Sequence, residues 1–568
     1  MTSLLFPGGS TTGGSTSGSG GIRFSPDLSD GEKKAIENRK AKVSSCLKNL
    51  GIKVDPNNVP QIAVVVSGGS LTATIACLGS LLELKNQNLL DAVTYIAGCS
   101  GSTWCMAPLY EKGNWTQNLD SIATEMCDKL ASLSFDAKKG LDKLLAAAEQ
   151  DNYSLTHFWA YGIVNYTVKG IIENGISSHR APCESGSVPY PFYSAADKLR
   201  LDTKGRNDAG AWFEFTPNET GYPLLGAFVS SELFDCKFSN GKLVKKEPEH
   251  DLCYLEAICS TALADLEATT KLIIEKMFEL LVDPYAPSTN PAPINLLSGV
   301  PVIGKYAEFL SSTLKLEDAI NGPVNVSKAV LENLITSLNV VHDTASAQLV
   351  KLMNDRWDTN DGVEKAHLAA TLKLLLALEF GGLVIPIAKL LIKTVLCLCG
   401  WIWGTTDNFL YKSSGSMPSD ITDKELRYFI DGGLAINSPY PCILRKVQNV
   451  QAIISFEFFP ALDPHLGIKQ TVDYCKANNI PFPKVEIDTA DRFNPKDCYI
   501  FEGEDAPTVI HIPLFNNVTS KGMVQERTAQ YSIVRLQYTK TEINDLMEVS
   551  TKNNAGKIKE AILRKCSI

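Results

Sequence analysis

The chain has 568 residues, of which 44% are hydrophobic and 21% are charged, so it is long enough to bury an extensive core. Its formal net charge of -9 argues against nucleic acid as a partner and gives no general electrostatic attraction to anionic membranes, so membrane contact is expected to be hydrophobic or locally basic. Its 15 cysteines, without a secretory signal or paired spacing, indicate reduced thiols in the cytosol.

A low-complexity tract opens the chain. Gly, Ser and Thr dominate residues 8–21, and the apolar stretch before them is too short for the core of a signal peptide. We therefore expect residues 1–28 to form a disordered tail. The charged segment 30–50 is expected to form an exposed helix.

The first chemically informative unit is a strand, a glycine turn and a helix in direct succession. The apolar run 62–66 predicts a buried strand, and the small-residue stretch 71–82 has helical spacing. Between them stands Ser67-Gly68-Gly69-Ser70, and glycines at such a turn let backbone N–H groups approach a ligand closely. The loop lacks the Gly-Lys-Ser/Thr and Gly-x-Gly-x-x-Gly patterns of nucleotide-binding loops, which argues against a nucleotide ligand.

A second unit of the same kind contains the leading candidate nucleophile. The apolar run 92–97 is followed by Gly98-Cys99-Ser100-Gly101-Ser102 and a helical stretch. A strand that breaks at a glycine and presents a serine before a helix is the layout of a nucleophile elbow, so we interpret Ser100 as the nucleophile. An ordinary Ser/Gly turn is the alternative that this pattern alone leaves open.

The two units together predict an oxyanion hole. Strand-turn-helix units in tandem favour parallel neighbouring strands, with both turns at the same edge of the sheet. Backbone N–H groups there would stabilise the negative charge that develops during acyl transfer at Ser100. The candidate donors are Gly68, Gly69, Ser70 and Gly101.

A serine nucleophile needs a base, and Asp431 is the better candidate. It follows the apolar run 428–430 and is followed by two glycines, so its carboxylate can lie close to another backbone turn. None of the seven histidines stands in a Gly-rich or strand-end setting, and His511 lies inside the strand-like run 508–512. From the residues alone, an ordinary Asp-Gly turn at Asp431 and a triad histidine that is distant in sequence both stay open.

The middle of the chain, about residues 262–400, is expected to be mostly helical. Its most apolar part, 368–403, is interrupted by Glu379, Lys389 and Lys393, and Pro386 breaks or kinks any helix there. A membrane span is therefore not expected. The segment is either core helices of the enzyme or a lid that contacts lipid.

Taken together, these motifs closely resemble the catalytic domain of the group IV cytosolic phospholipases A2, and within that family the gamma type. The motifs that carry the resemblance are residues 67–69, 98–104, 212–217, 403–410, 431–434 and 480–483. The resemblance implies an α/β fold whose α/β-hydrolase-like core is a mixed, largely parallel sheet flanked by helices. It further implies one catalytic domain over 29–568, in which the segment 262–400 forms a divergent helical cap. It also implies that Ser100 attacks a glycerophospholipid ester and that Asp431 takes its proton, without a histidine, metal or cofactor.

The same resemblance suggests where the protein acts. The chain leaves no room for the calcium-binding C2 domain of many relatives, so calcium independence is expected. The partners implied are a phospholipid membrane surface and a glycerophospholipid substrate, with a cytosolic protein that associates peripherally with intracellular membranes. Cys566 stands third from the end, so the prenylation box of gamma-type enzymes is absent, and Cys566 is either acylated or a plain tail cysteine.

One departure from the family opens an alternative function. The family's glycine loop carries an arginine that holds the substrate phosphate, and the matching position is Thr72, next to a third glycine replaced by Ser70. Threonine offers phosphate one neutral hydroxyl in place of a bidentate cation. Arg445 and Lys446 either replace this charge or are surface residues. The alternative is a catalytically weakened lipid-binding relative, or an acyltransferase with altered head-group preference.

Overall fold

The computed structural model describes residues 21–262, single positions between 269 and 280 and between 390 and 400, and residues 401–566 apart from 415–416, 460–462 and 553–554. Most of the expected tail and of the expected helical cap therefore lies outside the described residues. The end of the expected tail is ordered, because Ile22–Phe24 forms strand β1, which pairs with β7 (Ala227–Ser230) and buries Ile22. The expectation of disorder through residue 28 is corrected on this point.

A mixed sheet forms the centre of the described fold. Its middle strands run in the order β4, β3, β2, β12, β14, and each neighbouring pair among them is parallel. These strands are β2 (Gln61–Val66), β3 (Tyr95–Gly98), β4 (Tyr190–Asp197), β12 (Val450–Glu457) and β14 (Thr508–Pro513). Residues 62–66 are completely buried, as expected for a parallel strand that is covered on both faces. The predicted α/β-hydrolase-like fold class is confirmed.

The flanks of the sheet are antiparallel. On one side β4 pairs with β5 and with β11, the strand that ends at Asp431, and on the other side β13 pairs with β14. The flanking strands are β5 (Trp212–Phe215), β6 (Glu219–Tyr222), β10 (Thr405–Asp407), β11 (Leu426–Asp431) and β13 (Tyr499–Phe501), and a separate hairpin contains β8 (Lys237–Ser239) and β9 (Lys242–Lys245).

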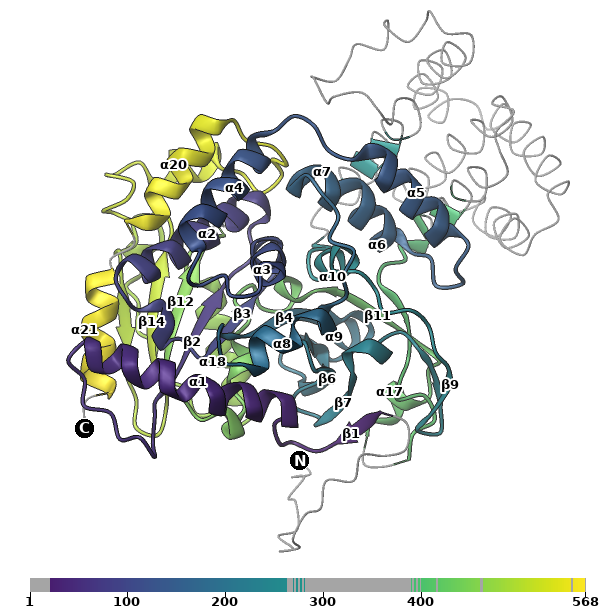
Figure 1. Cartoon of the computed structure of the whole chain (residues 1–568), viewed down its shortest axis with the longest axis horizontal. Helices are drawn as coiled ribbons and strands as arrows, with labels where there is room; N and C mark the ends of the chain where they lie inside the picture. Colours follow the sequence, from purple (N-terminus) through teal and green to yellow (C-terminus); the bar gives the residue numbers. More distant parts are fainter. Residues whose placement is uncertain are drawn as a thin grey trace, which may run out of the picture.

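Helices cover this sheet. The longer ones are α1 (Asp30–Asn49), α2 (Ser70–Asn86), α3 (Gly101–Glu111), α4 (Leu119–Ala131), α5 (Ala137–Ala148), α18 (Leu466–Ala477), α20 (Lys540–Thr551) and α21 (Ala555–Cys566). The shorter ones are α6 (Leu155–Phe158), α7 (Asn165–Val168), α8 (Arg180–Glu184), α9 (Lys198–Lys204), α10 (Leu252–Ile258), α17 (Ser419–Thr422) and α19 (Val524–Gln530). Helices α2, α4 and α20 pack against one another in a layer next to the parallel strands, and α21 packs on β12 and β14 (Figure 1). Within the described ranges, we find no helix with the length and apolar character needed to cross a bilayer.

Candidate active site

Ser100 occupies the strained backbone conformation of a nucleophile elbow. It lies between the end of β3 and the start of α3, with φ 50° and ψ -123°. A non-glycine residue with positive φ is held there by its surroundings, and such strain is typical of functional sites. The conformation turns the hydroxyl away from its own strand, and the residue is 8% exposed.

The two glycine turns meet, as the tandem strand-turn-helix units predict. A Cβ atom at Gly101 would lie 2.0 Å from the carbonyl oxygen of Ser70, so only glycine allows this approach. Two side-chain hydrogen bonds join the turns: Ser102 Oγ donates to the Ser67 carbonyl at 2.6 Å, and Thr74 Oγ1 donates to the Gly101 carbonyl at 2.8 Å. The glycine loop and the elbow are therefore one continuous unit.

The carboxyl group of Asp431 lies beside Ser100 and is completely buried. Its Oδ1 accepts hydrogen bonds from the Gly433 N–H at 2.7 Å and from the Cys99 thiol at 3.5 Å. Among the described residues, its Oδ2 has no hydrogen-bond partner, and the Ser100 hydroxyl lies near enough to lower the pKa of this carboxyl. The structure thus brings the candidate nucleophile and the candidate base together.

Burial makes Asp431 a stronger base than an ordinary aspartate. Loss of hydration raises the pKa of Asp431 to about 6, and the donors Ser100, Gly433 and Cys99 lower it in part. A carboxylate whose pKa lies close to neutrality is better matched to proton transfer near pH 7.

The expected oxyanion donors differ in how their N–H groups are used. The Gly68 N–H donates to the Asn437 carbonyl at 3.1 Å, so it is engaged. Among the hydrogen bonds of the described residues, none is donated by the backbone N–H of Gly69, Ser70 or Gly101. Ser70 and Gly101 begin α2 and α3, where the positive end of each helix dipole adds to the field. The N–H groups that stay available as oxyanion donors are therefore those of Gly69, Ser70 and Gly101.

Sequence reasoning missed two residues that hold the site together. Asn437 binds the glycine loop in both directions, because its Nδ2 also donates to the Gly68 carbonyl at 3.3 Å. Cys99 donates to the candidate base from the position before the nucleophile. Cys99 stands inside the motif 98–104 and Asn437 follows the motif 431–434 by three residues, so closeness in sequence to Ser100 and Asp431 was the available signal.

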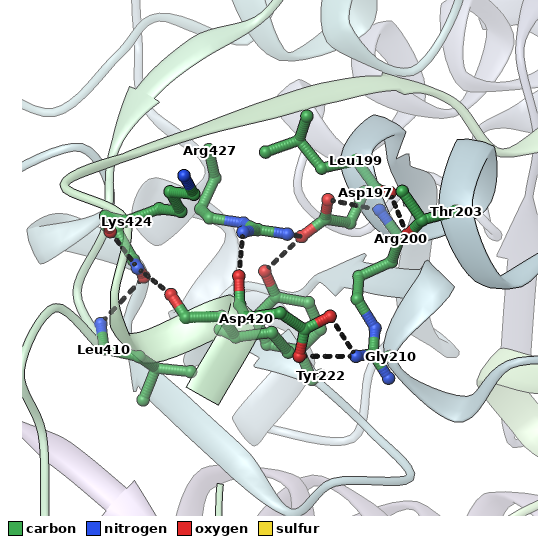
Figure 2. Close-up of polar contacts among 12 residues, drawn as sticks. Asp197, Leu199, Arg200, Thr203, Gly210, Tyr222, Leu410, Asp420, Lys424 and Arg427 are labelled. Carbon is green, nitrogen blue, oxygen red and sulfur yellow. Dashed lines mark hydrogen bonds and ion pairs between the residues drawn. The ribbon is translucent and has the colours of Figure 1, made fainter. Parts of the chain in front are cut away.

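A buried ion pair fixes the strand that carries Asp431. Arg427 on β11 donates to Asp197 on β4 through Nε at 2.9 Å and Nη2 at 2.5 Å, and the Tyr222 hydroxyl donates to the same oxygen at 2.7 Å (Figure 2). Asp431 pairs with Ala195 on β4. Because a slip by one residue would turn Asp431 to the opposite face of the sheet, this pair helps to specify the register that the site needs.

The described histidines lie elsewhere. His511 and His465 are completely buried and share a hydrogen bond, Nε2 to Nδ1, at 3.1 Å. His179 contacts Glu111, His250 contacts Asp235, and His157 accepts from the Ser154 N–H. In the part of the chain that the structure describes, no hydrogen bond joins a histidine to Ser100 or Asp431. His342 and His367 lie outside the described residues.

Thr72 does not have the environment of a head-group ligand. It is completely buried, its Oγ1 donates to the Tyr531 carbonyl at 3.1 Å, and the same hydroxyl lies 2.7 Å from the Tyr538 hydroxyl. The expectation that Thr72 contacts the lipid head group is corrected: its hydroxyl binds α2 to the segment before α20.

Arg445 is also buried. It forms ion pairs with Glu32 and Glu214 at 3.4 Å each, whereas Lys446 is exposed. Arg445 is therefore neither a replacement cation nor a surface residue.

Substitution of Thr72 is expected to destabilise the fold. Thr72→Arg would bury an unpaired cation, which costs roughly 3–5 kcal/mol. Thr72→Val would leave the Tyr531 carbonyl and the Tyr538 hydroxyl without their partner, at a cost of about 1–3 kcal/mol. Urea denaturation measures both changes, with Thr124→Val on the exposed surface of α4 as the matched control. A wild-type unfolding midpoint for Thr72→Arg would contradict the structural role.

The described cysteines are free thiols. Cys566 is 6% exposed at the end of α21, and burial raises the pKa of its thiol to about 11. Of the two interpretations, the plain tail cysteine fits this environment, because acylation needs an accessible thiol.

Comparison with known proteins places these motifs in a wider context. Residues 62–262 match a family model described as the lysophospholipase catalytic domain. Cytosolic phospholipase A2 gamma of Mus musculus is 34% identical over 552 residues, covering 94% of this chain and 90% of the relative. The gamma protein of Homo sapiens is 34% identical over 555 residues, covering 96% of each.

A solved structure shares the fold. Human GIVD cytosolic phospholipase A2 superposes with a TM-score of 0.64 at 24% identity, over 96% of this chain. The chain spans 66% of that solved chain. A second structure is described as the same human protein in complex with methyl gamma-linolenyl fluorophosphonate, with a TM-score of 0.63.

Proposed function

Because the chain belongs to the cytosolic phospholipase A2 family of phospholipase enzymes, we propose that it hydrolyses fatty-acyl esters of glycerophospholipids through a Ser100–Asp431 dyad. The observation that supports this most is the placement of a strained, positive-φ serine beside a buried carboxyl whose pKa is raised to about 6. We propose phospholipase A2 and lysophospholipase activities, since both break the same type of bond.

In the first half-reaction, the proton of the Ser100 hydroxyl passes to Asp431 as Oγ forms a bond to the ester carbonyl carbon. The carbonyl oxygen becomes negative and is stabilised by the N–H groups of Gly69, Ser70 and Gly101. The intermediate collapses, the bond to the lipid alcohol breaks, and Asp431 returns the proton to the leaving oxygen. The products are a free lyso-lipid and an acyl group on Ser100.

In the second half-reaction, Asp431 takes a proton from water, which attacks the acyl carbonyl and releases a fatty acid. The proton then returns to Ser100 Oγ, so the enzyme is regenerated. A lipid alcohol in place of water would give acyl transfer, with the same groups in the same roles. The base and the oxyanion donors come from the chain itself, and we propose that the reaction is independent of calcium.

We propose weak discrimination between phosphorylated and neutral lipids. The glycine loop 67–72 contains no lysine or arginine, and the Thr72 side chain is buried, so this loop offers a phosphate no charge-assisted contact. A lost charge-assisted contact corresponds to about 1.5–3 kcal/mol, or a factor of about 10 to 150 in selectivity. For the place of action, we propose a cytosolic protein that reaches phospholipid membranes peripherally.

A lipid panel tests this function. The purified full chain would be incubated with phosphatidylcholine, lysophosphatidylcholine and monoacylglycerol in mixed micelles, with and without a calcium chelator. We expect fatty acid release that the chelator does not reduce, with kcat/KM values for phosphorylated and neutral lipids within about tenfold of each other. A folded protein without turnover would instead favour the weakened lipid-binding relative, and dominant acyl transfer to an added lipid alcohol would favour the acyltransferase.

A further inference from the structure

Two side chains hold the carbonyl oxygen of Gly68. Asn437 Nδ2 donates to this oxygen at 3.3 Å, and Ser67 Oγ donates to it at 3.1 Å. The Gly68 N–H in turn donates to the Asn437 backbone carbonyl at 3.1 Å. Asn437 therefore binds Gly68 twice, with its side chain on the carbonyl and its main chain on the N–H.

The direction of the Gly68 carbonyl fixes the direction of the Gly69 N–H. The two groups belong to one peptide unit, which is planar and, like the other peptide bonds of the described residues, trans. In a trans unit the oxygen and the amide hydrogen point to opposite sides, so a carbonyl held toward Asn437 directs the Gly69 N–H away from it. Among the described residues, this N–H donates to no other group.

The same peptide unit begins at a residue that lies against the nucleophile. A Cβ atom at Gly68 would lie 2.8 Å from the Ser100 Cβ atom and 2.5 Å from Asn437 Oδ1. The Asn437 side chain and Ser100 therefore meet at one face of Gly68, where a larger residue would collide with both.

Both partners of this contact are fixed to the end of one central strand. The Ser438 hydroxyl, next to Asn437 in the chain, donates at 2.9 Å to the buried carboxyl of Glu457, the last residue of β12. Ser67 Oγ, at the start of the glycine loop, accepts from the N–H of the following residue, Phe458, at 2.7 Å. A donor that is held on such a frame stays aligned without reorganisation during the reaction.

We propose that Asn437 is a positioning residue for the oxyanion hole, which directs the Gly69 N–H toward the carbonyl oxygen of the lipid ester at Ser100. This inference rests on the proposed function, because it assigns a role within that reaction. Negative charge grows on the ester oxygen only as Ser100 Oγ bonds to the carbonyl carbon, so a misdirected donor weakens binding of the transition state more than binding of the ester. Loss of the Asn437 amide should therefore lower kcat and leave KM almost unchanged.

A second asparagine provides the matched control. Asn437→Ala removes the side-chain donor but keeps the backbone carbonyl that binds the Gly68 N–H. Asn478 is also half-buried, and its Nδ2 likewise donates to backbone carbonyls, those of Asn207 and Tyr474, so Asn478→Ala makes the same change elsewhere. Both full-length variants are assayed with lysophosphatidylcholine in mixed micelles. The readouts are kcat, KM, the pH at which the rate rises, and the melting temperature.

We expect Asn437→Ala to lower kcat about 10- to 100-fold with KM within about threefold of the wild-type value, whereas Asn478→Ala keeps the wild-type constants. The pH at which the rate rises should not move, because no hydrogen bond among the described residues joins Asn437 to the Asp431 carboxyl. An unchanged kcat in Asn437→Ala, an equal loss in both variants, or a shifted pH dependence would overturn the proposal.

If Asn437→Ala fails to fold, Asn437→Ser is used, whose shorter side chain should cause the same loss of kcat; a wild-type kcat would again overturn the proposal. A folded wild type without turnover would contradict the proposed function and this inference with it. An active wild type with an unaffected Asn437 variant would contradict the inference alone.

Discussion

Replacing Ser100 with alanine is expected to abolish lipid ester hydrolysis while leaving the melting temperature almost unchanged. The variant removes the oxygen atom that attacks the lipid ester in the proposed mechanism, and losses of this kind reach several orders of magnitude in serine hydrolases. The backbone strain at φ 50° stays, because alanine and serine meet the same steric limits there. Fatty acid release and thermal melting measure the two quantities.

Ser102→Ala is the matched control for this substitution. It removes a second hydroxyl from the same turn, one that donates to the Ser67 carbonyl at 2.6 Å. We expect it to lose about 1–3 kcal/mol of stability, because the buried Ser67 carbonyl loses its partner, and to keep measurable turnover. Turnover that persists in Ser100→Ala at more than about a hundredth of the wild-type rate would rule out Ser100 as the nucleophile.

Replacing Asp431 with asparagine is expected to lower kcat by at least about two orders of magnitude and to make the protein more stable at pH 7. Asparagine keeps the size of the side chain and an oxygen for the Gly433 N–H, but it cannot take the serine proton. The pKa of Asp431 is raised from 3.8 to about 6, so at neutral pH its charge costs the folded state roughly 3 kcal/mol. Removal of that charge should raise the melting temperature.

The same pKa shift fixes the sign of the pH dependence. The folded state binds the Asp431 proton more tightly than the unfolded state, so this group's stabilising contribution is present below about pH 4 and is lost as the pH rises through about 6. Activity needs the deprotonated carboxylate, so the wild-type rate should rise over the pH interval in which this stabilising contribution falls.

A His→Gln variant that keeps its melting temperature but loses as much activity as Asp431→Asn would show that the site is a triad and not a dyad.

The parts of the site that sequence could predict are local in the chain. The run 62–66 and the Ser100 elbow each combine a strand, a turn and a helix within a short segment, and their tandem order already placed both turns at one sheet edge. Asp431 was found for the same reason, since it ends a short apolar strand. The observed strand β3 is shorter than the run 92–97 suggested, because Leu90–Ala92 forms a 3-10 turn.

The parts that sequence could not predict depend on contacts between distant segments. Thr72 is held by Tyr531 and Tyr538, whose positions beside α2 are set by the packing of α20. The Gly68 N–H is engaged by Asn437, which lies on a different turn of the fold. A sequence motif gives residue types, but it does not show which backbone N–H groups already donate hydrogen bonds within the protein. It therefore could not show that Gly68, unlike Gly69, Ser70 and Gly101, has no free N–H for an oxyanion.

Mapping the site of a covalent adduct tests the central claim most directly. The folded wild type would be treated with a long-chain fluorophosphonate, which reacts with activated serines, and digested for tandem mass spectrometry. We expect one adduct, on Ser100, formed at least about a hundredfold more slowly in Asp431→Asn. An adduct on another residue, or equal labelling rates in the wild type and Asp431→Asn, would contradict a Ser100–Asp431 dyad.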